Sequence, residues 1–367
     1  MTHWLNLAWM KRTFKSSLPV EAPNTSILLG EPYEKIALPH LSGCWDSNFF
    51  RPGRVFRERQ YGGDMNEPTW LTESDTIADM VNHPAFAGFG AHLIPRPQDA
   101  QSDLPLREVG RLMPWHSHVQ PPVVLQAVNR MIADSSAGKT VFYNFYEEQQ
   151  KRARTGLFYF RGKPGAPFAL IFPGGGFAYV GSLHEGFPLA EVLSRKGYNA
   201  LVLQYRTGGP TVAYEDMAAA LSWIFHHADE LEVSTQSYSL WGGSAGARMA
   251  ADLGSYGAAA FGGEYIPRPA TVVMGYTGHE RYTKNDSPTF AVVSQDDPIA
   301  SPRVMERRIA ALNAAGVDTE FHLYRHAGHG FGVGTGTDAE GWMELAVRFW
   351  EKHMTNEVPS GDLLHVD

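Results

Sequence analysis

The sequence has a single cysteine, Cys44, among its 367 residues. One thiol excludes an intrachain disulfide and a metal site built from several cysteine ligands. Basic residues are also scarce, because 31 Lys and Arg stand against 39 Asp and Glu, for a formal net charge of -8. This acidic balance argues against a nucleic-acid partner and against binding to an anionic membrane surface.

Long hydrophobic runs are missing as well. No apolar stretch approaches the roughly 18 residues that a membrane span requires. The apolar stretch near the N-terminus, LNLAWM (5–10), is too short for the core of a signal peptide. We therefore expect no membrane partner and a cytoplasmic location by default. Secretion with a removed signal peptide and assembly into a homo-oligomer both remain open.

The first part of the chain, residues 1–135, is rich in Pro, His and Trp and has weak periodicity. It predicts loops and short helices packed through aromatic side chains, followed by a helix that Pro121 and Pro122 open. One interpretation is an N-terminal extension that acts as a cap over a site, and the other is plain packing or an oligomer contact. The aromatic candidates for lining a pocket under such a cap are Trp45, Phe86, Phe89 and Trp115.

The remainder, residues 136–367, alternates short apolar runs with helical patterns and predicts a catalytic domain of α/β class. The expected strands are 140–146, 156–161, 168–172, 199–205, 238–241, 270–276, 289–294 and 319–324. Continuous apolar strands between helices indicate a mostly parallel sheet with helices on both faces. Ligands of such sheets bind beyond the carboxyl ends of the strands.

Two glycine-rich motifs follow predicted strands. The stretch LIFPGGGFAYVG (170–181) holds three adjacent glycines but lacks the third glycine of a dinucleotide-binding loop. The second motif is Gly242-x-Ser244-x-Gly246, between the strand YSLW and a helical stretch. That setting is typical of a nucleophile elbow, a sharp turn that exposes a reactive serine.

The elbow explains the glycine triplet. When a serine attacks an acyl carbon, the carbonyl oxygen becomes an anion that needs preorganised hydrogen-bond donors. Gly175 and Gly176 can present bare backbone amides, and Ala245 supplies the amide after the serine, so these three predict an oxyanion hole. Phe177 and Gly243 beside them are candidate substrate-binding residues.

A serine nucleophile needs a base and an orienting carboxylate. His329 lies between Gly328 and Gly330 after the last predicted core strand, which favours it over His326. Asp297 follows another apolar strand and is the favoured carboxylate, although Asp296 remains an alternative. The predicted triad is therefore Ser244, Asp297 and His329, in the order expected on an open α/β sheet.

One further pair, His116 and His118 in WHSH, has a spacing that can ligate a metal from a strand. Because no third ligand is in view, the sequence favours a structural role for these histidines and predicts no metal site.

The motifs FPGGGFAYVG, LWGGSAGARMAADLG, SQDDPIASP and AGHGFG together resemble the α/β-hydrolase superfamily over about residues 140–355. They most resemble bacterial acetylxylan and feruloyl esterase-like enzymes, followed by hormone-sensitive-lipase-like esterases. The resemblance implies an α/β-hydrolase fold with about eight strands, no cofactor, and the same triad and oxyanion donors. Two residues depart from the pattern: Pro173 replaces the usual histidine before the glycines, and Gly243 replaces a bulkier residue before the serine.

These observations predict a serine carboxylic ester hydrolase that acts through an acyl-enzyme on a small-molecule ester, including carbohydrate or aromatic-acid esters. The alternative is a serine peptidase of the oligopeptidase type, which shares sheet and triad. A binding module with a vestigial site is the third hypothesis.

Overall fold

The computed structural model describes residues 69–146 and 155–354. The chain divides into two compact units, residues 1–59 and 60–367, and all described residues belong to the second. The boundary predicted at residue 135 stays a prediction, and the predicted pocket residue Trp45 lies outside the described residues.

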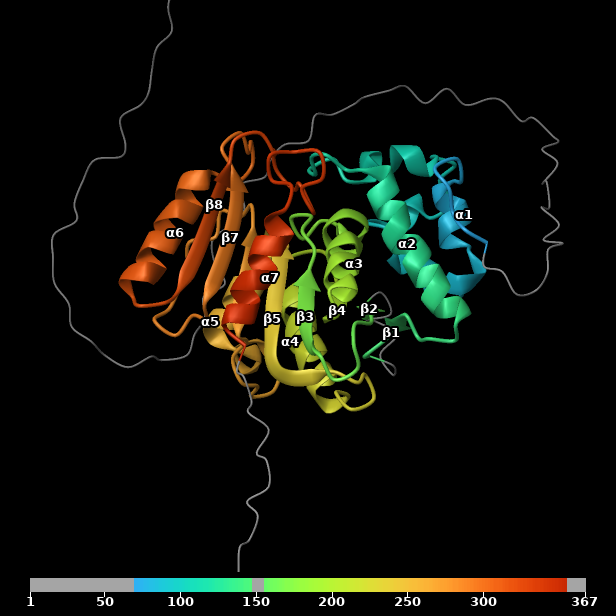
Figure 1. The fold of residues 1–367 in the computed structure, drawn as a ribbon. Helices are drawn as coiled ribbons and strands as arrows, with labels where there is room; N and C mark the ends of the chain where they lie inside the picture. The colour runs from blue at the N-terminus through green and yellow to red at the C-terminus, as the bar shows by residue number, and fades with distance from the viewer. Residues whose placement is uncertain (1–68, 147–154, 355–367) are drawn as a thin grey trace, which may run out of the picture. The chain divides into compact units, whose positions relative to one another are not determined.

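The described residues form an eight-stranded, mostly parallel sheet with the order β1-β2-β4-β3-β5-β6-β7-β8 (Figure 1). Its strands are β1 (Phe142–Tyr143), β2 (Gly156–Phe160), β3 (Pro167–Phe172), β4 (Asn199–Gln204), β5 (Ser234–Gly243), β6 (Thr271–Gly275), β7 (Thr289–Ser294) and β8 (Thr319–Tyr324). Only β1 with β2 and β2 with β4 pair antiparallel. The predicted fold class is thereby confirmed.

The central strands are apolar because both of their faces are covered. Every residue of β4 and β7 is buried, and so is every residue of β3 except the first. The strand predicted over 140–146 is much shorter than expected and is confined to β1. Its end is explained by Asn144, whose side-chain oxygen accepts a hydrogen bond from the Tyr146 amide and turns the chain out of the ladder.

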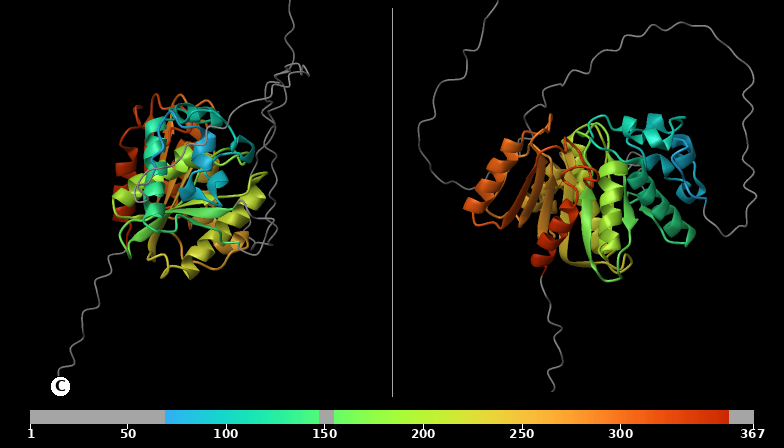
Figure 2. Two further views of the ribbon diagram at one scale, coloured as in Figure 1. Left: turned by 90° about the vertical axis from the view of Figure 1, so that its right-hand side faces the viewer. Right: turned by 45° about the horizontal axis from the view of Figure 1, so that its top comes forward.

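Helices cover both faces of this sheet (Figure 2). α3 and α7 pack together on one face, and α4 and α5 pack together on the other (Figure 1). The α-helices are α1 (Ile77–Val81), α2 (Pro121–Ser136), α3 (Phe187–Arg195), α4 (Pro210–His226), α5 (Ala245–Tyr256), α6 (Pro302–Ala314) and α7 (Trp342–Lys352). Shorter helical turns are η1 (Pro84–Phe86), η2 (Gly90–His92), η3 (Pro97–Asp99), η4 (Leu106–Leu112), η6 (Ser182–Gly186) and η7 (Ala258–Phe261).

The segment before the sheet, residues 69–135, packs onto the same hydrophobic core through aromatic side chains, as its composition predicts. Phe89 stacks on Phe142 with ring centroids 5.1 Å apart, and also contacts Phe158 edge-on at 6.2 Å. This segment therefore lies against the β1–β2 edge of the sheet and is not an independent module.

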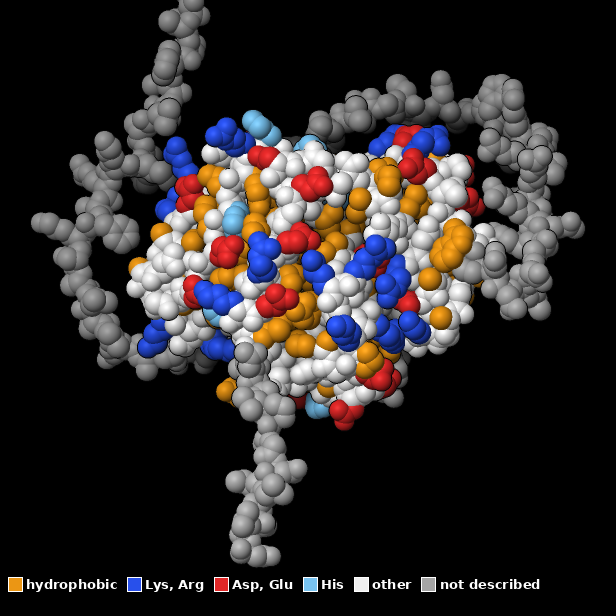
Figure 3. All heavy atoms as spheres, in the orientation of Figure 1, with side chains coloured by type: hydrophobic (Ala, Val, Ile, Leu, Met, Phe, Trp, Pro, Cys, Tyr) orange, Lys and Arg blue, Asp and Glu red, His pale blue; other side chains and the backbone are white. Residues whose placement is uncertain are grey.

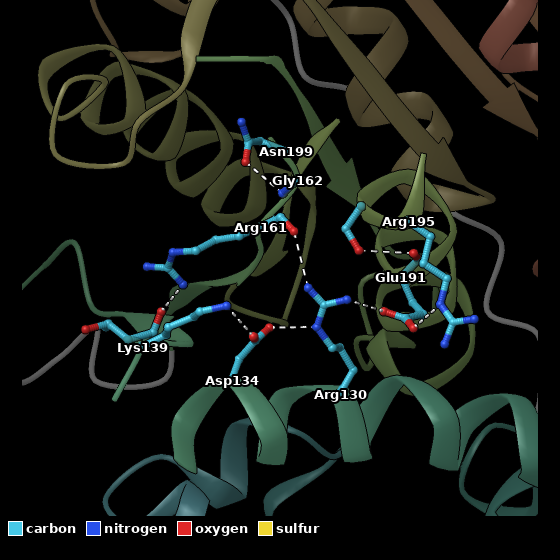
Figure 4. A network of polar contacts seen from close by, with 10 residues as sticks. Arg130, Asp134, Lys139, Arg161, Gly162, Glu191, Arg195 and Asn199 are labelled. Atoms are coloured by element: carbon cyan, nitrogen blue, oxygen red, sulfur yellow. Dashed lines mark hydrogen bonds and ion pairs between the residues drawn. The ribbon is translucent and has the colours of Figure 1, made fainter. Parts of the chain in front are cut away.

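A polar network also joins α2 to α3 (Figure 4). On α2, Arg130 forms an ion pair with Asp134 at 2.9 Å and reaches Glu191 of α3 at 3.7 Å. Glu191 is buried and pairs with Arg195 one helical turn later at 2.6 Å. Since the carboxylate of Glu191 is shared between two guanidinium groups, its burial is compensated.

On the face that α7 covers, Lys and Arg side chains alternate with Asp and Glu side chains (Figure 3). Two of the ion pairs on α7 are Lys196 with Glu344 at 3.3 Å and Lys352 with Asp318 at 2.5 Å. Within residues 69–146 and 155–354, no helix is long and apolar enough to cross a membrane.

The strand register places three loops and the elbow at the carboxyl ends of the strands. β3 and β5 end side by side, with Phe172 opposite Gly242, so the glycine-rich loop leaves the sheet next to the elbow. β7 and β8 also end together, with Ser294 opposite Tyr324. The loops that carry the predicted carboxylate and imidazole therefore begin at neighbouring strand ends.

Candidate active site

Ser244 occupies a strained turn between β5 and α5. Its backbone angles are φ 52° and ψ -116°, a conformation that L residues rarely adopt and that occurs at functional turns. The turn is tight on both sides: a Cβ on Gly242 would lie 2.3 Å from the Gly246 carbonyl, and a Cβ on Gly246 would lie 1.8 Å from the Phe172 oxygen. Only glycine fits at these two positions, which accounts for the G-x-S-x-G spacing.

The structure brings Ser244, His329 and Asp297 together. His329 Nε2 lies 2.9 Å from Ser244 Oγ, and His329 Nδ1 lies 2.8 Å from Asp297 Oδ2. The side chain of Asp297 is 0% exposed and that of His329 is 5% exposed, while Ser244 is partly open to solvent. This is the geometry of a serine nucleophile with a base that a buried carboxylate orients.

Neighbouring backbone amides hold Asp297 in place. Its Oδ1 accepts hydrogen bonds from the amides of Ile299 at 2.8 Å and Ala300 at 2.7 Å. These bonds hold the carboxylate with both oxygens near the imidazole, because His329 Nδ1 lies 3.0 Å from Oδ1 and 2.8 Å from Oδ2. Asp297 is therefore fixed before any substrate binds.

Asp296, the alternative carboxylate, has a different environment. Its Oδ1 accepts hydrogen bonds from Ser294 Oγ at 2.5 Å and from the Gly328 amide at 2.9 Å. Slight burial opposes the charge, but these hydrogen bonds hold the pKa of Asp296 below its usual value. Its nearest imidazole is that of the exposed His326, at 3.8 Å. Asp296 thus ties the histidine loop to the end of β7 rather than orienting His329.

The glycine-rich loop lies directly against the elbow. A Cβ on Gly174 would come within 2.9 Å of Ser244 Cβ. Gly175 and Gly176 have φ values of 126° and 60°, which suit glycine. Within the described part of the chain, no acceptor takes the amide hydrogens of Gly175, Gly176 or Ala245. These are the three amides predicted to bind an oxyanion.

The Gly174 amide behaves differently and donates to Glu185, a buried residue of η6 that sequence reasoning missed. The carboxylate of Glu185 also lies 2.9 Å from Nε2 of His116, and Nδ1 of His116 lies 2.9 Å from the Tyr179 hydroxyl. His116 therefore has the structural partners that the sequence favours over metal binding. Among residues 69–146 and 155–354, no three His, Cys, Asp or Glu side chains gather as a metal site.

The segment that contains His116 also reaches the other loops of the site. The Ser117 amide donates to the His329 carbonyl at 2.8 Å. Trp115 stacks on Tyr179 with centroids 5.2 Å apart, and its ring would lie 2.9 Å from a Cβ on Gly176. Of the aromatic residues proposed for a cap, the described structure thus places Trp115 at the site, whereas Phe86 and Phe89 contact each other away from it.

The two candidate substrate-binding residues are both buried. Phe177 packs edge-on against Tyr205 and Tyr214, each with ring centroids 6.3 Å away. Gly243 faces Glu185, because a Cβ there would lie 2.5 Å from Glu185 Oε2. The glycine before the nucleophile, which departs from the family pattern, therefore makes room for the buried carboxylate. Substrate contact by Phe177 and Gly243 stays a prediction.

Comparison with known proteins finds the same fold. Residues 162–271 match the BD-FAE family model. The esterase Est2 of Thermogutta terrifontis, solved with propionate bound, is 20% identical with a TM-score of 0.50, over 57% of this chain and 93% of that chain. The carboxylesterase Cest-2923 of Lactobacillus plantarum is 20% identical with a TM-score of 0.48, over 55% and 94% of the two chains.

A third solved structure is an acetyl ester-xyloside bifunctional hydrolase from Caldicellulosiruptor lactoaceticus, 18% identical with a TM-score of 0.49, over 57% of this chain and 95% of that chain. A comparison with curated protein sequences finds no match. The sheet topology, the elbow and the family-model match agree with the resemblance seen in the sequence motifs. The chain has the α/β-hydrolase fold, and its residues 162–271 match the model of the BD-FAE family, an esterase-like α/β-hydrolase family.

Proposed function

We propose that this α/β hydrolase cleaves carboxylic esters through an acyl-enzyme formed on Ser244. The observation that carries the proposal is the continuous line of contacts from Ser244 Oγ through His329 to Asp297. Contacts of 2.8–2.9 Å are short enough for proton transfer from the hydroxyl to the imidazole as the nucleophile attacks.

In the first half of the reaction, Ser244 Oγ forms a bond to the ester carbon while its proton moves to His329 Nε2. The carbonyl oxygen becomes an oxyanion, to which the amides of Gly175, Gly176 and Ala245 would donate hydrogen bonds. The carbon–oxygen bond to the alcohol then breaks, and His329 returns the proton to the departing oxygen. Asp297 stabilises the imidazolium that exists between the two steps.

In the second half, water replaces the alcohol. His329 takes a proton from the water as its oxygen attacks the acyl carbon, the same three amides stabilise the second oxyanion, and Ser244 leaves with the proton that His329 returns. The products are the free acid and the resting enzyme, so the triad, the three amides and water account for the whole cycle.

The substrates we propose are small or medium esters, including those of carbohydrates or aromatic acids. Trp115 supports a restricted pocket, because its ring lies over Gly176, one of the proposed oxyanion donors. An acyl or alcohol group bound at this point would lie against the indole ring of Trp115. A panel of esters that varies acid and alcohol separately, with acetylated sugars and feruloyl esters, would identify the preferred class.

The mechanism is tested by the hydrolysis of p-nitrophenyl acetate and butyrate by wild type and Ser244→Ala. We expect kcat to fall by at least about 10⁴-fold in the variant, because the nucleophile is lost while the fold remains. Ser194→Ala is the matched control, since Ser194 Oγ donates only to the Glu191 carbonyl on α3. Equal rates in wild type and Ser244→Ala would refute the proposal, and a preference for aminoacyl anilides would favour the peptidase alternative.

A further inference from the structure

Behind the glycine-rich loop, which carries two of the proposed oxyanion donors and is called the oxyanion loop below, lies a carboxylate that the reaction itself does not use. Glu185 belongs to η6, and its side chain is only 1% exposed. Its Oε2 accepts a hydrogen bond from the Gly174 amide at 2.5 Å. A Cβ on Gly174 or Gly243 would lie 2.6 or 2.5 Å from that same oxygen. The carboxylate thus packs against the backbone of both the glycine-rich loop and the elbow.

The second carboxylate oxygen faces the segment that precedes the sheet. Glu185 Oε1 lies 2.9 Å from Nε2 of His116, whose side chain is 2% exposed. His116 in turn lies 2.9 Å from the hydroxyl of Tyr179, which belongs to the glycine-rich segment. One carboxylate therefore contacts the loop directly and also supports it through a histidine from a distant part of the chain.

The same cluster reaches the loop of the catalytic base. A Cβ on Gly330 would lie 3.0 Å from the His116 ring and 3.2 Å from Glu185 Oε1. Tyr276, which directly follows β6, lies beside Glu185, because a Cβ on Gly243 would meet both side chains, and its ring centroid is 5.4 Å from that of His329. Glu185 thus sits where the oxyanion loop, the elbow and the histidine loop come together.

The surroundings of Glu185 favour its ionised form in spite of its burial. Burial alone would raise its pKa, but the His116 imidazole, the Gly174 amide and the nearby His184 together hold the pKa of Glu185 at about 2. A buried ionised carboxylate costs several kcal/mol unless it is paired and hydrogen-bonded. Because its partners belong to the loops of the site, the charge is stable only while those loops keep their positions.

We propose that Glu185 is a positioning residue for catalysis, which fixes the oxyanion loop against the elbow so that the Gly175 and Gly176 amides stay aimed at the reacting carbonyl. This inference rests on the proposed ester hydrolysis. His116 supports this arrangement from the other side, because its Nε2 lies 2.9 Å from Glu185 Oε1 and its Nδ1 lies 2.9 Å from the Tyr179 hydroxyl. The role differs from catalysis proper, since Glu185 acts on the reacting atoms only through the backbone of the loop.

The test compares Glu185→Gln with wild type in the hydrolysis of p-nitrophenyl acetate. Glutamine keeps the volume and one acceptor, but its amide nitrogen must face either the Gly174 N–H or the His116 ring, where an acceptor is needed. We expect kcat to fall about 10- to 100-fold with KM changed less than about threefold, because donors displaced by a fraction of an ångström lose transition-state stabilisation.

Glu191→Gln is the matched control. Glu191 is an equally buried, ion-paired glutamate one and a half turns further along, but its partners are Arg130 and Arg195. A general loss of stability from removing a buried charge would affect both variants, whereas a fall in kcat confined to Glu185→Gln supports positioning. A kcat within twofold of wild type, or a change in KM alone, would overturn the inference.

A second readout does not depend on turnover. Amide hydrogen exchange in peptides that cover residues 173–181 should accelerate at least about tenfold in Glu185→Gln and stay unchanged in Glu191→Gln, and unchanged exchange in both would overturn the inference. If wild type hydrolysed no ester, the proposed function would fail while exchange still decided whether Glu185 holds the loop. Should Glu185→Gln not fold, His116→Gln is measured instead with the same expected results.

Discussion

Replacing Asp297 with asparagine tests the arrangement of the triad at a single atom. In the native site, Asp297 Oδ1 accepts from the Ile299 and Ala300 amides and lies 3.0 Å from His329 Nδ1, whereas Oδ2 is the nearer oxygen, at 2.8 Å. The asparagine oxygen would keep the two backbone bonds, since only an acceptor fits there. Its NH2 group would then replace Oδ2 and donate toward His329 Nδ1.

Because the atom nearest to Nδ1 is then a donor, this reversal favours the wrong tautomer of the imidazole. With Nδ1 acting as acceptor, the ring proton moves to Nε2, which can no longer take the proton from Ser244 at 2.9 Å. We expect Asp297→Asn to lower kcat at neutral pH by about 10⁴-fold, equivalent to about 5 kcal/mol of transition-state stabilisation. KM should change little, because Asp297 is fully buried and does not face the solvent-exposed side of Ser244.

The neighbouring Asp296→Asn provides the matched control. Asp296 accepts from Ser294 and Gly328 and does not contact the triad imidazole, so its loss should cost less than about tenfold in kcat. The assay is steady-state hydrolysis of p-nitrophenyl acetate together with circular dichroism of each variant. If Asp297→Asn retained more than a tenth of the wild-type kcat, or if Asp296→Asn were the more damaging change, the assignment of the orienting carboxylate would be refuted.

Two further outcomes follow from the surroundings of the triad. Trp115→Ala removes the ring over Gly176 and should raise the ratio of kcat/KM for octanoate over acetate esters at least roughly tenfold, whereas Trp70→Ala, half exposed, should leave it unchanged. His184 should make stability depend on pH. Burial, together with His116, lowers the pKa of His184 to about 4 in the folded protein. Below pH 6.5, the usual pKa of histidine, the unfolded chain therefore binds a proton that the folded protein does not. The free energy of unfolding in urea should therefore drop by about 1.5 kcal/mol from pH 6.5 to 5, and an equal drop in His184→Gln would contradict this origin.

The parts of the site that could be predicted share one property: residues close to them in the sequence identify them. Ser244 and His329 are recognisable because glycines flank them and each follows a predicted strand, so residue type and position in the sheet agree. The choice between Asp296 and Asp297 depends instead on a turn in which two amides bind one side chain. Pro298 marks a turn at this point, but it does not indicate which aspartate the amides bind.

Glu185 could not be predicted for a related reason. A glutamate beside a helix usually lies on the surface, and nothing in LHEG marks it as buried. Its burial is stabilised by His116 and Tyr276, which are far away in the sequence and meet it only in the folded chain. The short β1 has a comparable origin, since the apolar pattern of 140–146 continues where the turn at Asn144 ends the pairing.

The contact between the Ser117 amide and the His329 carbonyl joins the earliest described part of the chain to one of the latest. During synthesis, the partner of Ser117 is made only after every strand of the sheet has been translated. In refolding of the full chain, this contact joins residues far apart in sequence and forms only once both segments are docked, so enzymatic competence should appear as the last event, later than the recovery of helical signal. Turnover of an ester would then report completion of the native state more strictly than any spectroscopic measure of secondary structure.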